Sequence, residues 1–249
     1  MVLWIAMAAL AAAVCVPLLL ALRRAPPAGA APAAVDIYRD QLDELGRDLD
    51  RDLIRSDEAE AATVTTCLLT PEATAGPYWV QENLTRRNVT EGKSGLPLVI
   101  RFTVLNAKTC KPIPKADVEI WHCDALGNYS AVNGASTRYL RGHQKAGATG
   151  KAEFLTIFPG WYPGRTPHIH MKVSVGGNVV HTGQVFMNEA VTRAVYKQKP
   201  YSSKGAYDTP HASDMIYSQA GGSTAELKLT RRAGGLKGYL GTIAIGVVA

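Results

Sequence analysis

Two histidines one residue apart, His168 and His170, open the alternating segment His-Ile-His-Met-Lys-Val. In an extended strand successive side chains point to opposite faces, so these two imidazoles project from the same face. Two adjacent imidazoles supply half of a metal site. The run Trp161–Thr166, directly upstream, adds a phenol and a fixed positive charge among turn formers. We therefore expect a metal centre in this part of the chain, with its remaining ligands on neighbouring loops.

Tyrosines are the best-placed partners for this histidine pair. Tyr162 lies just upstream across a Pro-Gly turn, and Tyr129 follows the strand-like segment Val118–Asp124. The absence of a Cys-x-x-Cys pattern argues against structural zinc, and the few nearby acidic residues argue against a two-histidine, one-carboxylate iron(II) centre. Phenolate is a hard anionic donor that suits a trivalent cation, and the cation keeps the phenol deprotonated. Two tyrosinates with two neutral imidazoles indicate iron(III).

The elements that must position these residues are short strands. From Cys67 onward, alternating or β-branched runs are separated by Gly, Pro and Asn, which predicts an all-β sandwich of mixed or antiparallel strands. The expected strands are Leu96–Leu105, Ala116–Cys123, Ala152–Ile157, His168–Val175, Gln184–Met187 and Gly241–Ala249. Ala190–Tyr196 is expected to form one or two helical turns.

The N-terminal residues differ in character from this β-rich body. Residues 2–22 are apolar and uncharged, and Arg23 and Arg24 precede an Ala/Pro-rich stretch that ends at Ala34. The apolar run is long enough to span a bilayer. We predict that residues 1–34 are a signal peptide or a membrane anchor, so that the protein is secreted or anchored facing outward.

An acidic segment over residues 35–62 separates this leader from the domain expected over 63–249. Four apolar residues recur in it at four-three-four spacing, which predicts an amphipathic helix over 36–57. The whole chain has a formal net charge of +6. Its bases are scattered and accompany no nucleic-acid motif, so we expect a solvated surface and no nucleic-acid partner.

Three cysteines follow the leader, namely Cys67, Cys110 and Cys123. They permit one disulfide and a free thiol, or three reduced thiols. In an exported chain we expect the pair Cys67–Cys110, since both lie in turn-like surroundings, whereas Cys123 lies in an apolar strand and should be buried and inert. Asn83 and Asn88 begin formal glycosylation sequons, whose occupancy the sequence leaves open.

Five blocks of sequence resemble the intradiol ring-cleavage dioxygenases, a family that includes catechol and protocatechuate dioxygenases. These blocks are Thr74–Tyr78, Asp117–Ser130, Tyr139–Gly142, Thr156–His170 and Thr182–Phe186. They occur in order and with compatible spacing over about residues 67–249. The chain is most similar to the exported branch of the family.

The resemblance implies a role for each matching residue. The implied ligands of one non-haem iron(III) per chain are Tyr129, Tyr162, His168 and His170. The residues implied beside the substrate ring are Arg165 and Gln184. The residues that match the family's substrate-pocket segment are Ala75, Gly76, Pro77 and Tyr78.

The implied reaction opens a catechol-type ring between its two hydroxyls with O2 and gives a cis,cis-muconate-type diacid, a step of aromatic compound catabolism. Iron(III), two tyrosinates and one hydroxide form a neutral centre. A catecholate dianion that replaces one tyrosinate and the hydroxide keeps it neutral, which avoids costly buried charge. The resemblance implies that Tyr162 leaves and accepts a substrate proton, while Tyr129 stays bound. Arg165 would stabilise the negative charge that develops on the ring.

Two departures from the family pattern affect these expectations. The connector from Tyr162 to His168 is short compared with the cytoplasmic enzymes, which suggests a more open site. The family's N-terminal helical dimerisation region is replaced by a different segment, so a monomer is favoured.

Two other functions fit parts of the same pattern. One is a non-catalytic β-sandwich of the same architecture that binds metal or carbohydrate. The other is a copper enzyme of superoxide-dismutase type, which needs further histidines around the pair, and the motifs that would supply them are missing.

Overall fold

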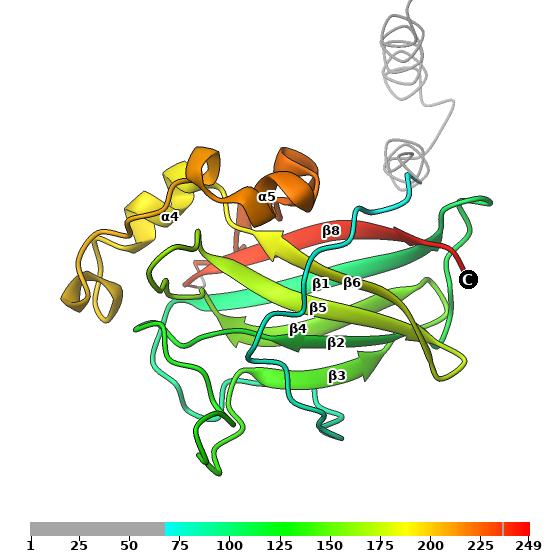
Figure 1. Cartoon of the computed structure of the whole chain (residues 1–249), viewed down its shortest axis with the longest axis horizontal. Helices are drawn as coiled ribbons and strands as arrows, with labels where there is room; N and C mark the ends of the chain where they lie inside the picture. Colours follow the sequence, from blue (N-terminus) through cyan, green and yellow to red (C-terminus); the bar gives the residue numbers. More distant parts are fainter. Residues whose placement is uncertain (1–67, 236) are drawn as a thin grey trace, which may run out of the picture. The chain divides into compact units, whose positions relative to one another are not determined.

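The computed structural model describes residues 68–235 and 237–249. The predicted leader, the acidic helix and Cys67 lie outside the described residues. Among those that are described, no helix is both long and apolar enough to cross a membrane. The described chain folds into two four-stranded sheets packed face to face, which confirms the expected all-β sandwich (Figure 1).

Each sheet combines strands from distant parts of the chain. The first sheet has the order β4-β1-β8-β7, built from β1 (Pro97–Asn106), β4 (Lys151–Ile157), β7 (Lys228–Arg231) and β8 (Tyr239–Val247). The second has the order β3-β2-β5-β6, built from β2 (Asp117–Trp121), β3 (Arg141–Lys145), β5 (His168–Val175) and β6 (Asn178–Phe186). Strands β1 and β8 are parallel and the other pairs antiparallel, so the sandwich is mixed.

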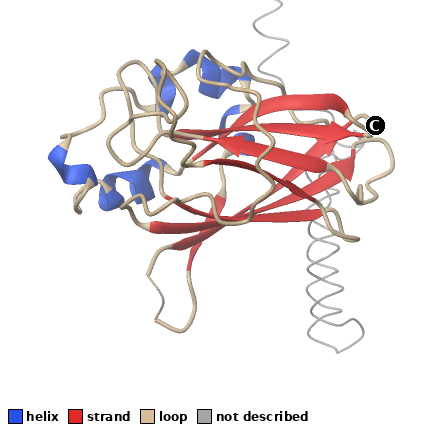
Figure 2. Ribbon diagram, turned by 90° about the horizontal axis from the view of Figure 1, so that it is seen from below, coloured by secondary structure: helices blue, strands red, loops and turns tan. Residues whose placement is uncertain are grey.

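Short helices fill the connection between β6 and β7. They are α4 (Glu189–Val195), η1 (Tyr201–Ser203), η2 (His211–Ser213), α5 (Met215–Gln219) and η3 (Gly222–Ala225). Helix α4 confirms the helical turns expected there. Figure 2 shows these helices gathered at one end of the strands, away from the C-terminus.

Strand boundaries follow the predicted pattern where one face of a strand is apolar. Strand β5 has the bounds expected, but β6 begins at Asn178 rather than at Gln184. The first residues of β6 are polar or exposed, so they carry no apolar alternation, and the Gly176-Gly177 turn that starts the strand has positive φ at both residues. Strands β3 and β7 were not predicted because edge strands that are rich in charge lack the apolar alternation.

The core lies between the two sheets. Alternate residues of β1 are buried in it, namely Leu98, Ile100, Phe102 and Val104. The second sheet contributes Val118, Ile120, Ile169, Met171 and Val173 from β2 and β5. Because side chains alternate along a strand, the histidines of β5 point to the opposite, outer face of that sheet.

This outer face is covered by the segment 72–86, drawn in cyan in Figure 1, which crosses the strands of the second sheet. The Ala73 N–H donates to the Thr182 carbonyl of β6 at 3.0 Å, and the Arg86 N–H donates to the His143 carbonyl of β3 at 3.1 Å. The first four residues of β5 are buried on both faces, because the core covers the inner face and this segment crosses the outer one. The predicted metal centre therefore lies outside the sandwich core, beneath a crossing segment.

Replacement of Phe154 by Ala tests the placement of the core. Phe154 is fully buried, with its ring edge-to-face against Phe102 at 6.2 Å between centroids. Phe154→Ala should lower the free energy of unfolding by about 3–5 kcal/mol in denaturant titrations, since it removes contacts and leaves a cavity. Val179→Ala, at a residue that is 57% exposed, should change it by less than about 0.5 kcal/mol. If Phe154→Ala lowers the free energy of unfolding by no more than Val179→Ala does, Phe154 does not lie in the core.

Candidate metal centre

Strand β5 brings His168 and His170 together, as the alternation predicted. Both side chains are buried, and their Nε2 atoms lie 3.1 Å apart. His168 donates its Nδ1–H to the Thr166 carbonyl at 2.7 Å, so its Nε2 presents a lone pair to the centre. A histidine that binds metal through one ring nitrogen ordinarily donates a hydrogen bond from the other nitrogen. That hydrogen bond fixes the orientation of the ring and its tautomer.

His170 is oriented by packing. Its ring stacks on Trp121 at 5.0 Å between centroids with 7° between the planes, and its Nδ1 is buried without a hydrogen bond. Trp121 and His170 are cross-strand neighbours in the β2–β5 register, which explains the stacking. Gly76 also lies against this ring, since an added Cβ would come within 3.2 Å of His170 Cε1, and φ at Gly76 is +67°. Trp121 and Gly76 are thus both close neighbours of the imidazole.

Tyr162 reaches the centre from the turn that precedes β5. Tyr162 and Arg165 form an isolated bridge, with Gly164 between them at φ +82°. This tight turn is the reason for the short connector noted in the sequence. The Tyr162 hydroxyl lies 3.0 Å from His168 Nε2. Three donor atoms, one oxygen and two nitrogens, thus converge.

Tyr129 approaches from the loop that follows β2. Asp124 shapes this loop, because its Oδ1 accepts hydrogen bonds from the N–H groups of Leu126 and Asn128 at 3.0 and 2.9 Å. The Tyr129 ring meets the Tyr162 ring edge-to-face at 5.8 Å between centroids. The Tyr129 hydroxyl is buried and makes no hydrogen bond of ordinary geometry, and its interaction with the Tyr162 phenol raises its pKa further. A buried hydroxyl without such a bond is costly, and a bound cation would supply a partner.

Burial leaves all four donor side chains neutral when no metal is bound. It lowers the pKa of His168 to about 3 and that of His170 well below its usual value, with the Arg165 charge adding to both shifts. It raises the pKa of Tyr162 to about 12 and that of Tyr129 well above its ordinary range. Neutral imidazoles are the metal-binding form, and a cation would reverse the effect of burial on the phenols. The donor set fits a hard trivalent ion such as iron(III).

Arg165 lies beside these donors with its guanidinium held at three points. Its Nε donates to Asp214 Oδ2 at 3.0 Å, its Nη2 donates to Gln184 Oε1 at 2.5 Å, and its Nη1 lies 3.4 Å from His168 Nε2. Gln184 in turn donates from Nε2 to the Thr74 carbonyl at 2.8 Å. Arg165 and Gln184 are therefore brought together as predicted, next to the histidine pair.

Asp214 is a site residue that the sequence analysis missed. It is 3% exposed, and its Oδ2 also accepts from the Thr166 N–H at 3.0 Å. Its Oδ1 caps α5 by accepting from the N–H groups of Ile216 and Tyr217. An aspartate before Met-Ile-Tyr is a helix N-cap signal, but nothing in that signal indicates a pairing with Arg165.

Only some residues of the predicted substrate-pocket segment 75–78 lie at the candidate site. Tyr78 stacks on Tyr129 at 4.4 Å between centroids and meets Tyr162 edge-to-face at 5.9 Å. Ala75 packs in the same aromatic cluster, whereas Pro77 is exposed. Together with Gly76 against His170, Ala75 and Tyr78 border the candidate metal centre.

Of the two described cysteines, we expect Cys110 to form a disulfide and Cys123 to be a buried free thiol. Cys110 is disulfide-bonded, and Cys123 is a free, buried thiol. Burial raises the pKa of Cys123 to about 12, so the thiol is inert as predicted. The expected partner of Cys110, Cys67, lies outside the described residues, and that pairing stays a prediction.

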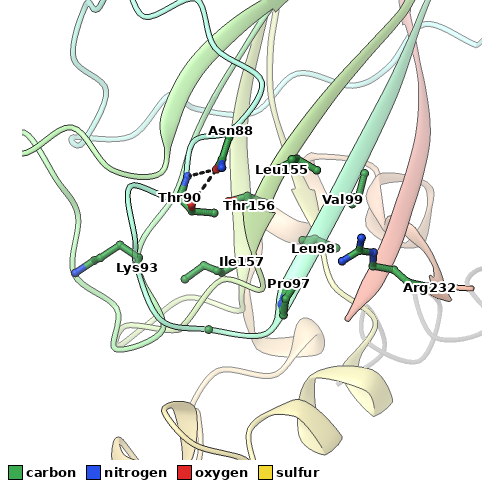
Figure 3. A pocket seen from close by; sticks show the side chains of 11 residues that line it. Asn88, Thr90, Lys93, Pro97, Leu98, Val99, Leu155, Thr156, Ile157 and Arg232 are labelled. Atoms are coloured by element: carbon green, nitrogen blue, oxygen red, sulfur yellow. Dashed lines mark hydrogen bonds between the residues drawn. The ribbon is translucent and has the colours of Figure 1, made fainter. Parts of the chain in front are cut away.

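A pocket of about 280 Å³ lies at the first sheet and is separate from this centre (Figure 3). Its walls come from β1, β4, the segment that leads into β1, and the residue that follows β7. The residues that line it are Asn88, Thr90, Lys93, Gly95, Pro97, Leu98, Val99, Leu155, Thr156, Ile157 and Arg232. None of the predicted ligand or substrate residues is among them.

Comparisons with known proteins find similarity to dioxygenases. The family model described as dioxygenase matches residues 74–190, which contain all four candidate ligands. Catechol 1,2-dioxygenase 1 from Acinetobacter lwoffii is 36% identical over 101 residues, covering 37% of this chain. The match spans 32% of that relative, so the chain covers about a third of its length.

Solved structures match over more of the chain. An intradiol ring-cleavage dioxygenase from Tetranychus urticae has 30% identity and a TM-score of 0.70, covering 73% of this chain and 95% of that one. The dioxygenase domain of a dioxygenase carbohydrate-binding protein fusion from Streptomyces sp. SirexAA-E has 27% identity and a TM-score of 0.53. That match covers 71% of this chain and 96% of the bacterial domain.

The substitution Asp214→Asn tests whether the Asp214 carboxylate holds Arg165 in place. Burial by itself would raise the pKa of Asp214, but the Thr166 N–H and the Arg165 charge outweigh it and hold the pKa below its usual value. Such a carboxylate stabilises the fold above its unfolded pKa of about 3.9, and this stability is lost as the pH falls through the lower folded pKa. In denaturant titrations at pH 7, Asp214→Asn should lower the free energy of unfolding by about 1.5–3 kcal/mol.

The difference from the wild type should begin to narrow below about pH 4, where the unfolded chain takes up a proton at Asp214, and should narrow further as the folded carboxylate becomes protonated at its lower pKa. Asp208→Asn, at an exposed residue, serves as the matched control. A difference that stays constant or widens in acid would show that the Asp214 charge does not support the site.

Proposed function

The chain belongs to the intradiol ring-cleavage dioxygenase family, and we propose that it cleaves catechol-type substrates between their two hydroxyls with O2. The product would be a cis,cis-muconate-type diacid, and the cofactor one non-haem iron(III). The observation that carries this proposal is the convergence of two phenols and two imidazoles: the Tyr162 hydroxyl and His170 Nε2 both lie within 3.1 Å of His168 Nε2, beside the buried Tyr129 hydroxyl.

We propose that Tyr129, Tyr162, His168 and His170 hold the metal, and that neutral imidazoles and phenolates balance its charge. When bound, iron(III) would act as a Lewis acid that makes the substrate ring reactive toward O2. The remaining chemistry is the work of the protein: it must accept protons from the catechol, orient the ring and stabilise negative charge on it.

Tyr162 is the residue best suited to accept a substrate proton. Its side chain is less buried than that of Tyr129 and sits on a short turn next to the site. Burial raises the pKa of Tyr162 to about 12, so its phenolate is a strong base once it is released from the cation. Tyr129 is buried under the stacked ring of Tyr78 and is suited to remain a ligand.

Arg165 is suited to stabilise negative charge on the ring. Its guanidinium cannot deprotonate, and contacts from Asp214 and Gln184 fix its position 3.4 Å from His168 Nε2. A cation oriented before the reaction begins incurs little reorganisation as charge develops. Gln184 also contacts the Thr74 carbonyl, which joins Arg165 to the segment that borders the substrate.

Oxygen uptake by the iron-loaded protein tests this function. The wild type should consume O2 with catechol and form a muconate-type product, whereas resorcinol, whose hydroxyls are not adjacent, should give none. Tyr162→Phe should lower the rate by about 100-fold or more, because it removes the base that accepts the proton. Tyr239→Phe, in the other sheet, is the matched control and should retain the rate. Absence of uptake by the wild type, or full activity of Tyr162→Phe, would contradict the proposal.

We also propose that residues 1–34 direct the domain out of the cytoplasm, to be secreted or anchored facing outward. The disulfide-bonded Cys110 supports this, because disulfides persist mainly in oxidising compartments. Expression of the full chain in a secreting host, followed by fractionation, provides the check. The intact chain should be found in the medium or exposed to external protease, and deletion of 2–22 should retain it inside. Cytoplasmic retention of the intact chain would overturn the proposal.

A further inference from the structure

Lys204 joins the two loops that carry the candidate phenol ligands. Its ammonium Nζ donates to the Leu126 carbonyl and to the Trp161 carbonyl, each at 2.6 Å. The first carbonyl lies just upstream of Tyr129 in the chain, and the second directly precedes Tyr162. The same ammonium lies 4.9 Å from the centroid of the Trp161 ring. One side chain thus holds the backbone of both loops.

The base of this side chain is itself firmly anchored. Lys204 follows the 3-10 helix η1, and its N–H donates to the Tyr201 carbonyl at 3.0 Å. Tyr201 is 2% exposed, and its hydroxyl donates to the Phe158 carbonyl at 2.8 Å and accepts from the Leu96 N–H at 2.9 Å. The ammonium is therefore presented to the loops from a buried support.

The two loops fit closely where the ammonium joins them. Gly127 has φ +87°, and a Cβ added there would lie 2.1 Å from the Trp161 carbonyl oxygen and 2.3 Å from Lys204 Nζ. Nearby, the Gly160 N–H donates to the Asp124 carbonyl at 3.1 Å. Two carbonyl oxygens that share one ammonium would repel each other if the charge were removed. Loss of the ammonium should therefore separate the loops.

We propose that Lys204 is a positioning residue that sets the separation of the Tyr129 and Tyr162 loops, and through it the geometry of the two phenols. Lys204 contacts the loops through backbone carbonyls, so it acts through the two tyrosines. The inference rests on the proposed function as far as iron is concerned. Its structural part, the joining of the loops, can be measured in the metal-free protein.

The test compares Lys204→Met with the wild type in the full chain. The matched control is Lys197→Met, at an exposed lysine. In the metal-free protein, hydrogen exchange should become faster in peptides that cover 124–129 and 159–165, including the Gly160 amide, and stay unchanged in the β5 peptide. In the iron-loaded protein, release of iron to a chelator should become about 10-fold faster, as for other residues that support metal ligands.

Restoring the ammonium separates a positioning role from general damage. Lys204→Cys alkylated with 2-bromoethylamine regains an ammonium on a side chain of lysine length. Cys123 is buried, and the wild type treated with the same reagent controls for reaction at the other native cysteines. This modified variant should recover slow exchange in both loops and slow iron release. The unmodified Lys204→Cys variant should behave as Lys204→Met does.

The outcomes distinguish the two proposals. If the wild type binds no iron, the proposed function fails, and loop exchange in the metal-free variants still decides the role of Lys204. If Lys204→Met and Lys197→Met show the same loop exchange, or if alkylation restores nothing, Lys204 does not position the loops. If loop exchange rises while iron release is unchanged, Lys204 does not act on the phenol ligands.

Discussion

The structure depends on one constraint, which is that lone pairs from two phenols and two imidazoles converge in one place, with the Arg165 guanidinium as the charged group beside them. The Tyr162 hydroxyl and His170 Nε2 each lie within 3.1 Å of His168 Nε2, and the buried Tyr129 hydroxyl makes no hydrogen bond of ordinary geometry. Unpaired polar atoms in such surroundings cost free energy. A trivalent cation would satisfy all four, and two phenolates would balance most of its charge. Asp214 and Gln184 hold Arg165 beside these donor atoms.

The sandwich core and the candidate metal centre occupy opposite faces of the same sheet. Ile169 and Met171 alternate with the histidines of β5 and point into the core, so packing between the sheets holds the strand that carries the ligands. The outer face is closed by the segment 72–86, with Gly76 against His170. Loops at one end of the strands provide the two candidate phenol ligands. The site thus rests on a rigid strand, while its border is made of loops that can vary.

Much of this arrangement could be predicted from local sequence. The alternation around Ile169 placed His168 and His170 on one face, and the resemblance to a known family linked them with Tyr129 and Tyr162. Contacts between distant segments could not be predicted. Asp214 pairs with Arg165 across a long connection, and its local signal is only that of a helix cap. Edge strands β3 and β7 carry polar residues, so no periodic signal marked them.

The visible spectrum of the iron-loaded wild type, recorded with the bound iron counted, tests the central claim most directly. Four ligands that include two tyrosinates should bind one iron(III) per chain and give a coloured protein with a tyrosinate-to-iron charge-transfer band. The band should shift when catechol is added without O2, as one tyrosinate is displaced. A protein that stays colourless with a full equivalent of iron(III), or that binds none, would contradict a metal centre built on Tyr129 and Tyr162.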